Sequence, residues 1–156
     1  MCRGLAFHRE IGGKHDFLHH TVGGEQSRVP VTFAGFLNQT EMPAAYAVTD
    51  CLVLPSDYGE TWGLVVNEAM ACGIPAVVSD RVGCGPDLVE HDVTGLVYPF
   101  GDVEALADAL RTLAIRPAQL AEMGARARDR VTDYSVERAV AGTLEAVRYV
   151  ATKRPG

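Results

Sequence analysis

Residues 51–79 read CLVLPSDYGETWGLVVNEAMACGIPAVVS, and the alternation within this run indicates the fold class. It begins with an apolar run, CLVLP, which Pro55 closes, as in a strand that is buried on both faces of a sheet. A polar loop then leads into LVVNEAMAC, a helical segment that Gly73 ends. The apolar run PAVVS follows. Strand, helix and strand joined by short links predict a parallel sheet with right-handed crossovers.

The same alternation continues on both sides of this run. VTFAGF (31–36) is an expected strand, and the helical segment NQTEMPAAYAV follows it with Asn38 or Thr40 as the N-cap. After the central run, a short helix is expected at 86–90 and a short strand at 96–98. The sequence therefore predicts an α/β fold built on a doubly wound parallel sheet.

Three amphipathic helices are expected to complete the chain. Asp102 is the predicted N-cap of the first, Pro117 lies in the first turn of the second, and Ser135 caps the third. The third helix carries an apolar stripe that we interpret as core or interface: Val136, Val140, Thr143, Val147 and Val150.

Composition excludes several classes of protein. The chain has 156 residues, of which 47% are hydrophobic, and its net charge is 14 − 20 = −6. This acidic balance argues against a nucleic-acid partner. No window reaches the roughly 18 apolar residues of a membrane span, and the N-terminus lacks the apolar region of a signal peptide. We expect a cytoplasmic protein. Peripheral association with a membrane, through a part of the protein outside this chain, stays open.

The first 28 residues differ from the rest. They are rich in Gly and His and show no sustained period, so we treat 1–28 as an unmatched N-terminal segment and 29–156 as the folded domain. The four cysteines form no C-x-x-C pair, and no His lies at zinc-ligand spacing from them. We therefore expect reduced cysteines and no metal.

The loop between the two apolar runs of residues 51–79 carries the candidate chemistry. If a helix begins near Gly63 or Leu64, the free N–H groups of Gly63, Leu64 and Val65 form an anion site at the positive end of the helix dipole. Glu60 lies in the loop above this end, and Glu68 lies about one turn inside the helix. An anion site flanked by two carboxylates suits a sugar–diphosphate–ribose ligand, with the carboxylates facing hydroxyl groups.

The motif P-S…E-x7-E-A-M-A-x-G-x-P, with the short V-T-G-x-V piece and the G-D that opens the next helix, resembles the C-terminal half of family-4 retaining glycosyltransferases. These enzymes have the GT-B fold of two facing Rossmann-like domains. The resemblance covers residues 31–147, and it implies that this chain is one Rossmann-like, incomplete half of such an enzyme.

The resemblance also implies roles for individual residues. Glu60, the candidate catalytic residue, matches the Glu that reaches the hydroxyls of the transferred sugar, and Glu68 matches the Glu that holds the ribose. The remaining matches are segments rather than single side chains: Gly63, Leu64 and Val65 for the amides that hold the diphosphate and the sugar, and Gly35 and Phe36 for the edge of the base pocket. The family's mechanism needs no metal or other cofactor, and the nucleotide-diphosphate sugar is a substrate.

Two functions stay open at this point. The chain is either the donor-binding part of an enzyme that transfers a hexose-type sugar, or a non-catalytic module with a relic site. The resemblance implies a diphosphate-binding Arg and Lys in βα units that residues 1–28 do not match, and an acceptor domain that no stretch of this sequence matches. The expected partners are therefore that domain or a separate subunit. A homodimer through an exposed sheet edge or the last helix is the other expectation.

Several other residues near this loop have two interpretations. Asp57 and Glu60 resemble a glycosidase pair, but they share one loop without an opposing wall. Gly83-Cys84-Gly85 is either a phosphate cradle or a tight turn at a helix start, and Cys84 lacks the neighbouring base that a nucleophile needs. We expect Asp80 and Arg81 to form a surface ion pair rather than a phosphate contact, and Trp62 to anchor the loop by packing.

Overall fold

The computed structural model describes residues 16–22, 25–31 and 36–153. Strands β1 (Asp16–Val22) and β2 (Glu25–Val31) pair in antiparallel fashion in a two-stranded sheet of their own. The sequence predicts no strand within residues 1–28, because neither of these segments alternates cleanly between apolar and polar residues. The strand expected at 31–36 falls mostly on residues 32–35, which lie outside the described residues.

The central sheet is parallel and has the order β3-β4-β5, with strands β3 (Leu52–Leu54), β4 (Ala76–Ser79) and β5 (Gly95–Tyr98). All four residues of β4 are buried, as a central parallel strand requires. The apolar runs of the sequence therefore predicted these three strands correctly.

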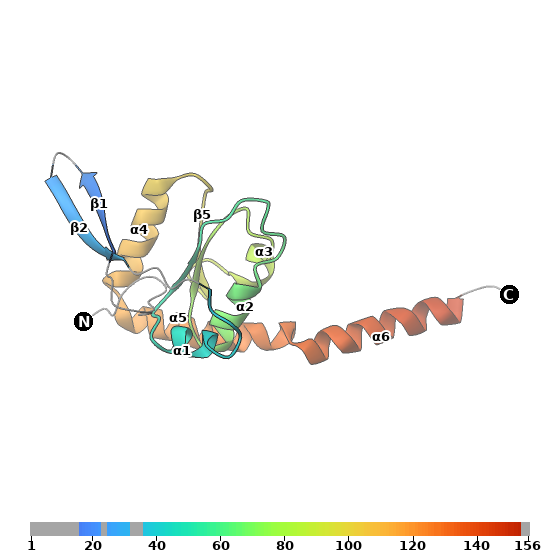
Figure 1. The fold of residues 1–156 in the computed structure, drawn as a ribbon. Coiled ribbons are helices and arrows are strands. Elements are labelled where there is room, and N and C mark those ends of the chain that lie inside the picture. The colour runs from blue at the N-terminus through green and yellow to red at the C-terminus, as the bar shows by residue number, and fades with distance from the viewer. Residues whose placement is uncertain (1–15, 23–24, 32–35, 154–156) are drawn as a thin grey trace.

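Helices cover both faces of this sheet, which confirms the doubly wound arrangement (Figure 1). One face packs against α2 (Leu64–Ala71), α3 (Gly85–Leu88) and the C-terminal part of α5 (Pro117–Val131). The other face packs against α4 (Val103–Ala114) and the N-terminal part of α5. The largest fully buried side chains come from both faces: Leu52, Met70, Leu88 and Met123.

Two of the predicted helix caps are present, and one is displaced. The Asp102 carboxylate accepts from the Ala105 amide at 2.9 Å, and the Ser135 hydroxyl accepts from the Arg138 amide at 3.3 Å. Helix α1 (Met42–Ala47) begins later than expected, with Glu41 at the N-cap position. The Asn38 side chain accepts from the amides of Thr40 and Glu41, at 2.9 and 3.2 Å, and so orders the turn ahead of the helix.

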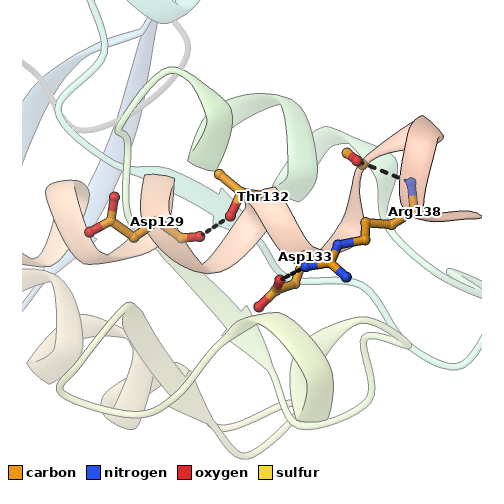
Figure 2. Close-up of polar contacts among 5 residues, drawn as sticks. Asp129, Thr132, Asp133 and Arg138 are labelled. Carbon is orange, nitrogen blue, oxygen red and sulfur yellow. Dashed lines mark hydrogen bonds and ion pairs between the residues drawn. The ribbon is translucent and has the colours of Figure 1, made fainter.

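Helix α6 (Val136–Lys153) projects from the body of the molecule, and none of its residues is buried (Figure 1). A single 3-10 turn, η1 (Thr132–Tyr134), joins it to α5. Figure 2 shows the polar contacts at this junction: the Thr132 hydroxyl donates to the Asp129 carbonyl at 2.7 Å, and Arg138 pairs with Asp133 at 3.3 Å. The apolar stripe of α6 therefore faces solvent in this structure.

The packing of α5 against the end of α2 requires a glycine. A Cβ on Gly124 would collide with the backbone carbonyl of Gly73, whereas a Cβ on Gly142 in α6 would meet no atom within 4 Å. We expect Gly124→Ala to lower the free energy of unfolding by about 1–3 kcal/mol through overpacking. Gly142→Ala should instead leave it unchanged or raise it by about 0.4–1 kcal/mol. Urea unfolding of both variants checks this, and equal losses would contradict the packing argument.

Candidate functional site

The candidate site lies where the carboxyl ends of the parallel strands open into loops. The loop after β3 begins with a turn in which the Asp57 carboxylate accepts from the Gly59 amide at 2.8 Å. The Glu60 amide then donates to the Asp57 carbonyl at 3.1 Å. These two bonds account for Asp57 as a turn-forming residue, and they place Glu60 at the end of an ordered turn.

A pair of backbone hydrogen bonds ties this loop to the turn after β4. The Gly83 amide donates to the Glu60 carbonyl at 3.3 Å, and the Cys84 amide donates to the Trp62 carbonyl at 2.8 Å. A Cβ on Gly83 would collide with the Thr61 carbonyl. The Gly83-Cys84-Gly85 segment is therefore a tight turn that leads into α3, and its glycine allows the two loops to touch.

Gly63 occupies the N-cap position of α2 with a φ of 98°, a conformation that favours glycine. The sequence predicts that the Gly63 amide contributes to an anion site, and the structure supplies a separate reason for a glycine at this position. A Cβ there would lie 3.1 Å from Leu54 Cδ2 and 3.3 Å from Val82 Cγ1, inside the core. Within the described part of the chain, no acceptor is bonded to the N–H groups of Gly63, Leu64 or Val65.

Trp62 anchors the loop by packing, as predicted. Its Nε1 donates to the Asn67 side chain at 2.8 Å, and its ring lies 6.1 Å from the ring of Tyr134. The indole packs against the core under α2. Trp62 thus fixes the start of α2 relative to η1.

Glu68 is held by a tyrosine that sequence reasoning missed. The hydroxyl of Tyr46, in α1, donates to Glu68 Oε2 at 2.8 Å. Burial raises the pKa of Tyr46 well above its ordinary value, and the hydrogen bond and charge of Glu68 act in the same direction. Tyr46 therefore stays a donor at neutral pH and orients the carboxylate. The sequence marks Tyr46 only as an aromatic residue in a short helix, which suggests packing rather than a polar role.

Three predicted site residues line one open groove of about 740 Å³: Phe36, Val65 and Glu68. The turn at residues 37–40 and Met42 complete its wall. Phe36 is 89% exposed and Leu64, beside the groove-lining Val65, is 69% exposed. Glu60 does not line this groove; it lies in the loop that precedes the N-cap of α2. Gly35 lies outside the described residues.

Arg81 does not form the expected ion pair. Asp80 and Arg81 are both described, and no ion pair joins them; the Asp80 carboxylate instead accepts from the Phe100 amide at 2.9 Å. The Arg81 guanidinium lies over the rings of Tyr58 and Phe100, 5.0 and 4.6 Å from their centroids. Residues from three loops thus meet at the edge of the sheet.

The buried thiols are not activated for nucleophilic attack. Burial raises the pKa of Cys84 to about 11, and the charges of Glu60 and Asp87 add to this effect. Burial likewise raises the pKa of Cys51 to about 12. Within the described residues, no group of three His, Cys, Asp or Glu side chains is placed to hold a metal ion. The expectation of metal independence stays a prediction.

Comparison with known proteins places the chain in a family. Residues 11–130 match the family described as glycosyl transferases group 1. Over 103 residues, the chain is 40% identical to D-inositol 3-phosphate glycosyltransferase of Saccharomonospora viridis. The aligned region covers 66% of this chain and 23% of that protein.

Solved structures with the same fold extend the comparison. Sucrose-phosphate synthase of Thermosynechococcus elongatus is 33% identical, with a TM-score of 0.65, over 77% of this chain and 30% of that one. Anabaena HepE in complex with UDP is 27% identical, with a TM-score of 0.61, over 69% of this chain and 30% of the HepE chain.

The chain belongs to the group 1 family of glycosyl transferases, and its sheet is a Rossmann-like half of the GT-B fold. It spans about a quarter of the length of the D-inositol 3-phosphate glycosyltransferase. No helix among the described residues combines the length and the apolar character that a membrane crossing requires.

Thiol reactivity should follow these environments. At pH 8 we expect iodoacetamide to modify the exposed Cys72 in the folded chain while Cys51 and Cys84 stay protected, because a raised pKa leaves less thiolate. Peptide mass spectrometry over time measures each site, and the urea-unfolded chain, in which the sites should react alike, is the control. Alkylation of folded Cys84 as fast as Cys72 would contradict the assignment.

Proposed function

We propose that this chain is the donor-binding, C-terminal half of a family-4 retaining glycosyltransferase, which binds a nucleotide-diphosphate sugar and transfers a hexose-type sugar. The groove carries the proposal, because Phe36, Val65 and Glu68 meet in it beside the start of α2. An exposed aromatic ring at one end suits a base, and an oriented carboxylate suits the two hydroxyls of a ribose.

The start of α2 suits the diphosphate. Three backbone N–H groups without an acceptor in the described chain, at the positive end of a helix dipole, form an anion site. The loop bonds to Gly83 and Cys84 fix these donors in advance, so they need no reorganisation when charge develops. Fixed dipoles aimed at a leaving diphosphate are a large source of rate enhancement.

Glu60 then faces the transferred sugar. Its turn is ordered by Asp57, and its carbonyl is bonded to Gly83, so the carboxylate projects from a fixed backbone. In the retaining mechanism that the motif resemblance implies, the diphosphate departs from the face that the acceptor attacks, and no metal is needed. Glu60 would accept hydrogen bonds from sugar hydroxyls during this step.

Related proteins support a nucleotide-sugar donor. The name of the Saccharomonospora viridis relative states a glycosyltransferase activity, and the Anabaena HepE structure holds UDP. We propose that the acceptor is bound by a further domain or a partner subunit, and that the protein works in the cytoplasm.

Calorimetric titration of the chain with UDP, GDP and ADP tests the donor site. We expect one nucleotide to bind saturably, and Glu68→Gln to weaken it about tenfold or more, since a hydrogen bond to a charged group contributes about 1.5–3 kcal/mol. Tyr46→Phe should weaken it less, because the carboxylate remains but loses its orienting donor. Glu145→Gln, on exposed α6, is the matched control and should change nothing.

The outcomes separate the alternatives. Loss of binding in Glu68→Gln, with an unfolding midpoint like that of the parent chain, supports ribose recognition by Glu68. A folded parent chain that binds none of the three nucleotides at millimolar concentration would contradict an autonomous donor site. Equal affinities for the parent and Glu68→Gln would contradict the role of Glu68 alone.

A further inference from the structure

Arg81 is held at the carboxyl edge of the sheet by two aromatic rings. Tyr58 belongs to the loop after β3, Arg81 follows β4, and Phe100 follows β5. The guanidinium carbon lies 5.0 Å from the centre of the Tyr58 ring and 4.6 Å from that of Phe100. Contacts between a guanidinium and ring faces stabilise its position and leave its N–H edge available.

No acidic residue of these loops, Glu60 included, forms an ion pair with that edge among the described residues. The carboxylates of Asp57, Asp80 and Asp102 accept from the backbone amides of their own or a neighbouring loop, at 2.8, 2.9 and 2.9 Å. No described residue accepts a hydrogen bond from the Arg81 guanidinium or forms an ion pair with it. A permanently charged, positioned guanidinium therefore presents unused donors at the edge of the sheet where the α2 amides also lie.

Arg81 lies close in sequence to two residues whose backbone amides bond to the loop of the candidate site. Two residues after Arg81, the Gly83 amide bonds to the Glu60 carbonyl, and the Cys84 amide bonds to Trp62, next to the N-cap of α2. The planar fork of a guanidinium matches the oxygens of a phosphate, and such charge-assisted bonds are stronger than neutral ones.

We propose that Arg81 binds a phosphate group at this edge, supplied by the diphosphate of the donor or by a phosphorylated acceptor. Only the placement beside a nucleotide sugar rests on the proposed function. Anion binding by Arg81 follows from the ring contacts and the unused donors. This assigns to Arg81 a role that the expected surface ion pair with Asp80 would have excluded.

Inorganic pyrophosphate is the first probe. We expect saturable binding by the parent chain in calorimetry, weakened at least tenfold in Arg81→Met, whose unbranched apolar side chain should still contact the two rings. Arg81→Lys should retain part of the affinity, because it keeps the charge but loses the fork. Arg148→Met, on exposed α6, is the matched control. Urea unfolding confirms that each variant folds. Equal affinity for the parent and Arg81→Met, or no binding by the parent, would overturn the proposal.

Further ligands identify the source of the phosphate. If Arg81→Met weakens the binding of a nucleoside diphosphate but not that of the nucleoside, the phosphate belongs to the donor diphosphate. Arg81-dependent binding of glucose 6-phosphate, with an unchanged affinity for the nucleoside diphosphate, assigns a phosphorylated acceptor. Arg81-dependent pyrophosphate binding without any nucleotide binding supports the anion site and contradicts the nucleotide-sugar site. Nucleotide binding that is unchanged in Arg81→Met, by a parent chain that does not bind pyrophosphate, supports the nucleotide-sugar site and contradicts the anion site.

Discussion

At Gly83 the turn after β4 touches the loop after β3, and the candidate site depends on this contact. The Gly83 and Cys84 amides donate to the Glu60 and Trp62 carbonyls, and only a residue without a Cβ can approach Thr61 so closely. The contact sets the height of the loop above the sheet. The contact thereby fixes both the Glu60 backbone and the first amides of α2. Neither loop could fix both by itself.

The core beneath this contact explains why it is stable. Gly63 turns the chain with a positive φ so that α2 can lie across the sheet, and the space that a Cβ would need there is filled by Leu54 and Val82. Strand β4 is buried on both faces, so the loops at its end rise from a rigid base. The loops that carry function are therefore positioned by packing that ordinary core residues provide.

The sequence predicted the elements of this fold better than the contacts between its loops. Apolar runs, Asp102 and Ser135 are local signals, and the strands and caps that they predict are present. The hydrogen bond from Tyr46 to Glu68 and the contact of Arg81 with the Tyr58 ring join residues far apart in the chain, so no local sequence pattern predicts them. The strands β1 and β2 were missed because their side chains lack a clear period of two.

The charge of the chain makes the placement of its few local positive groups decisive. A protein with a net charge of −6 has no general attraction for a phosphorylated ligand, so binding must come from groups at the site itself. The amides at the start of α2 supply partial positive charge, and Arg81 supplies a full one at the same edge of the sheet. Asp57, Asp80 and Asp102 would oppose an anion there, but each is bonded to a backbone N–H that offsets part of its charge. The acidic loops can therefore accept a phosphate while Glu60 and Glu68 remain available for hydroxyl groups.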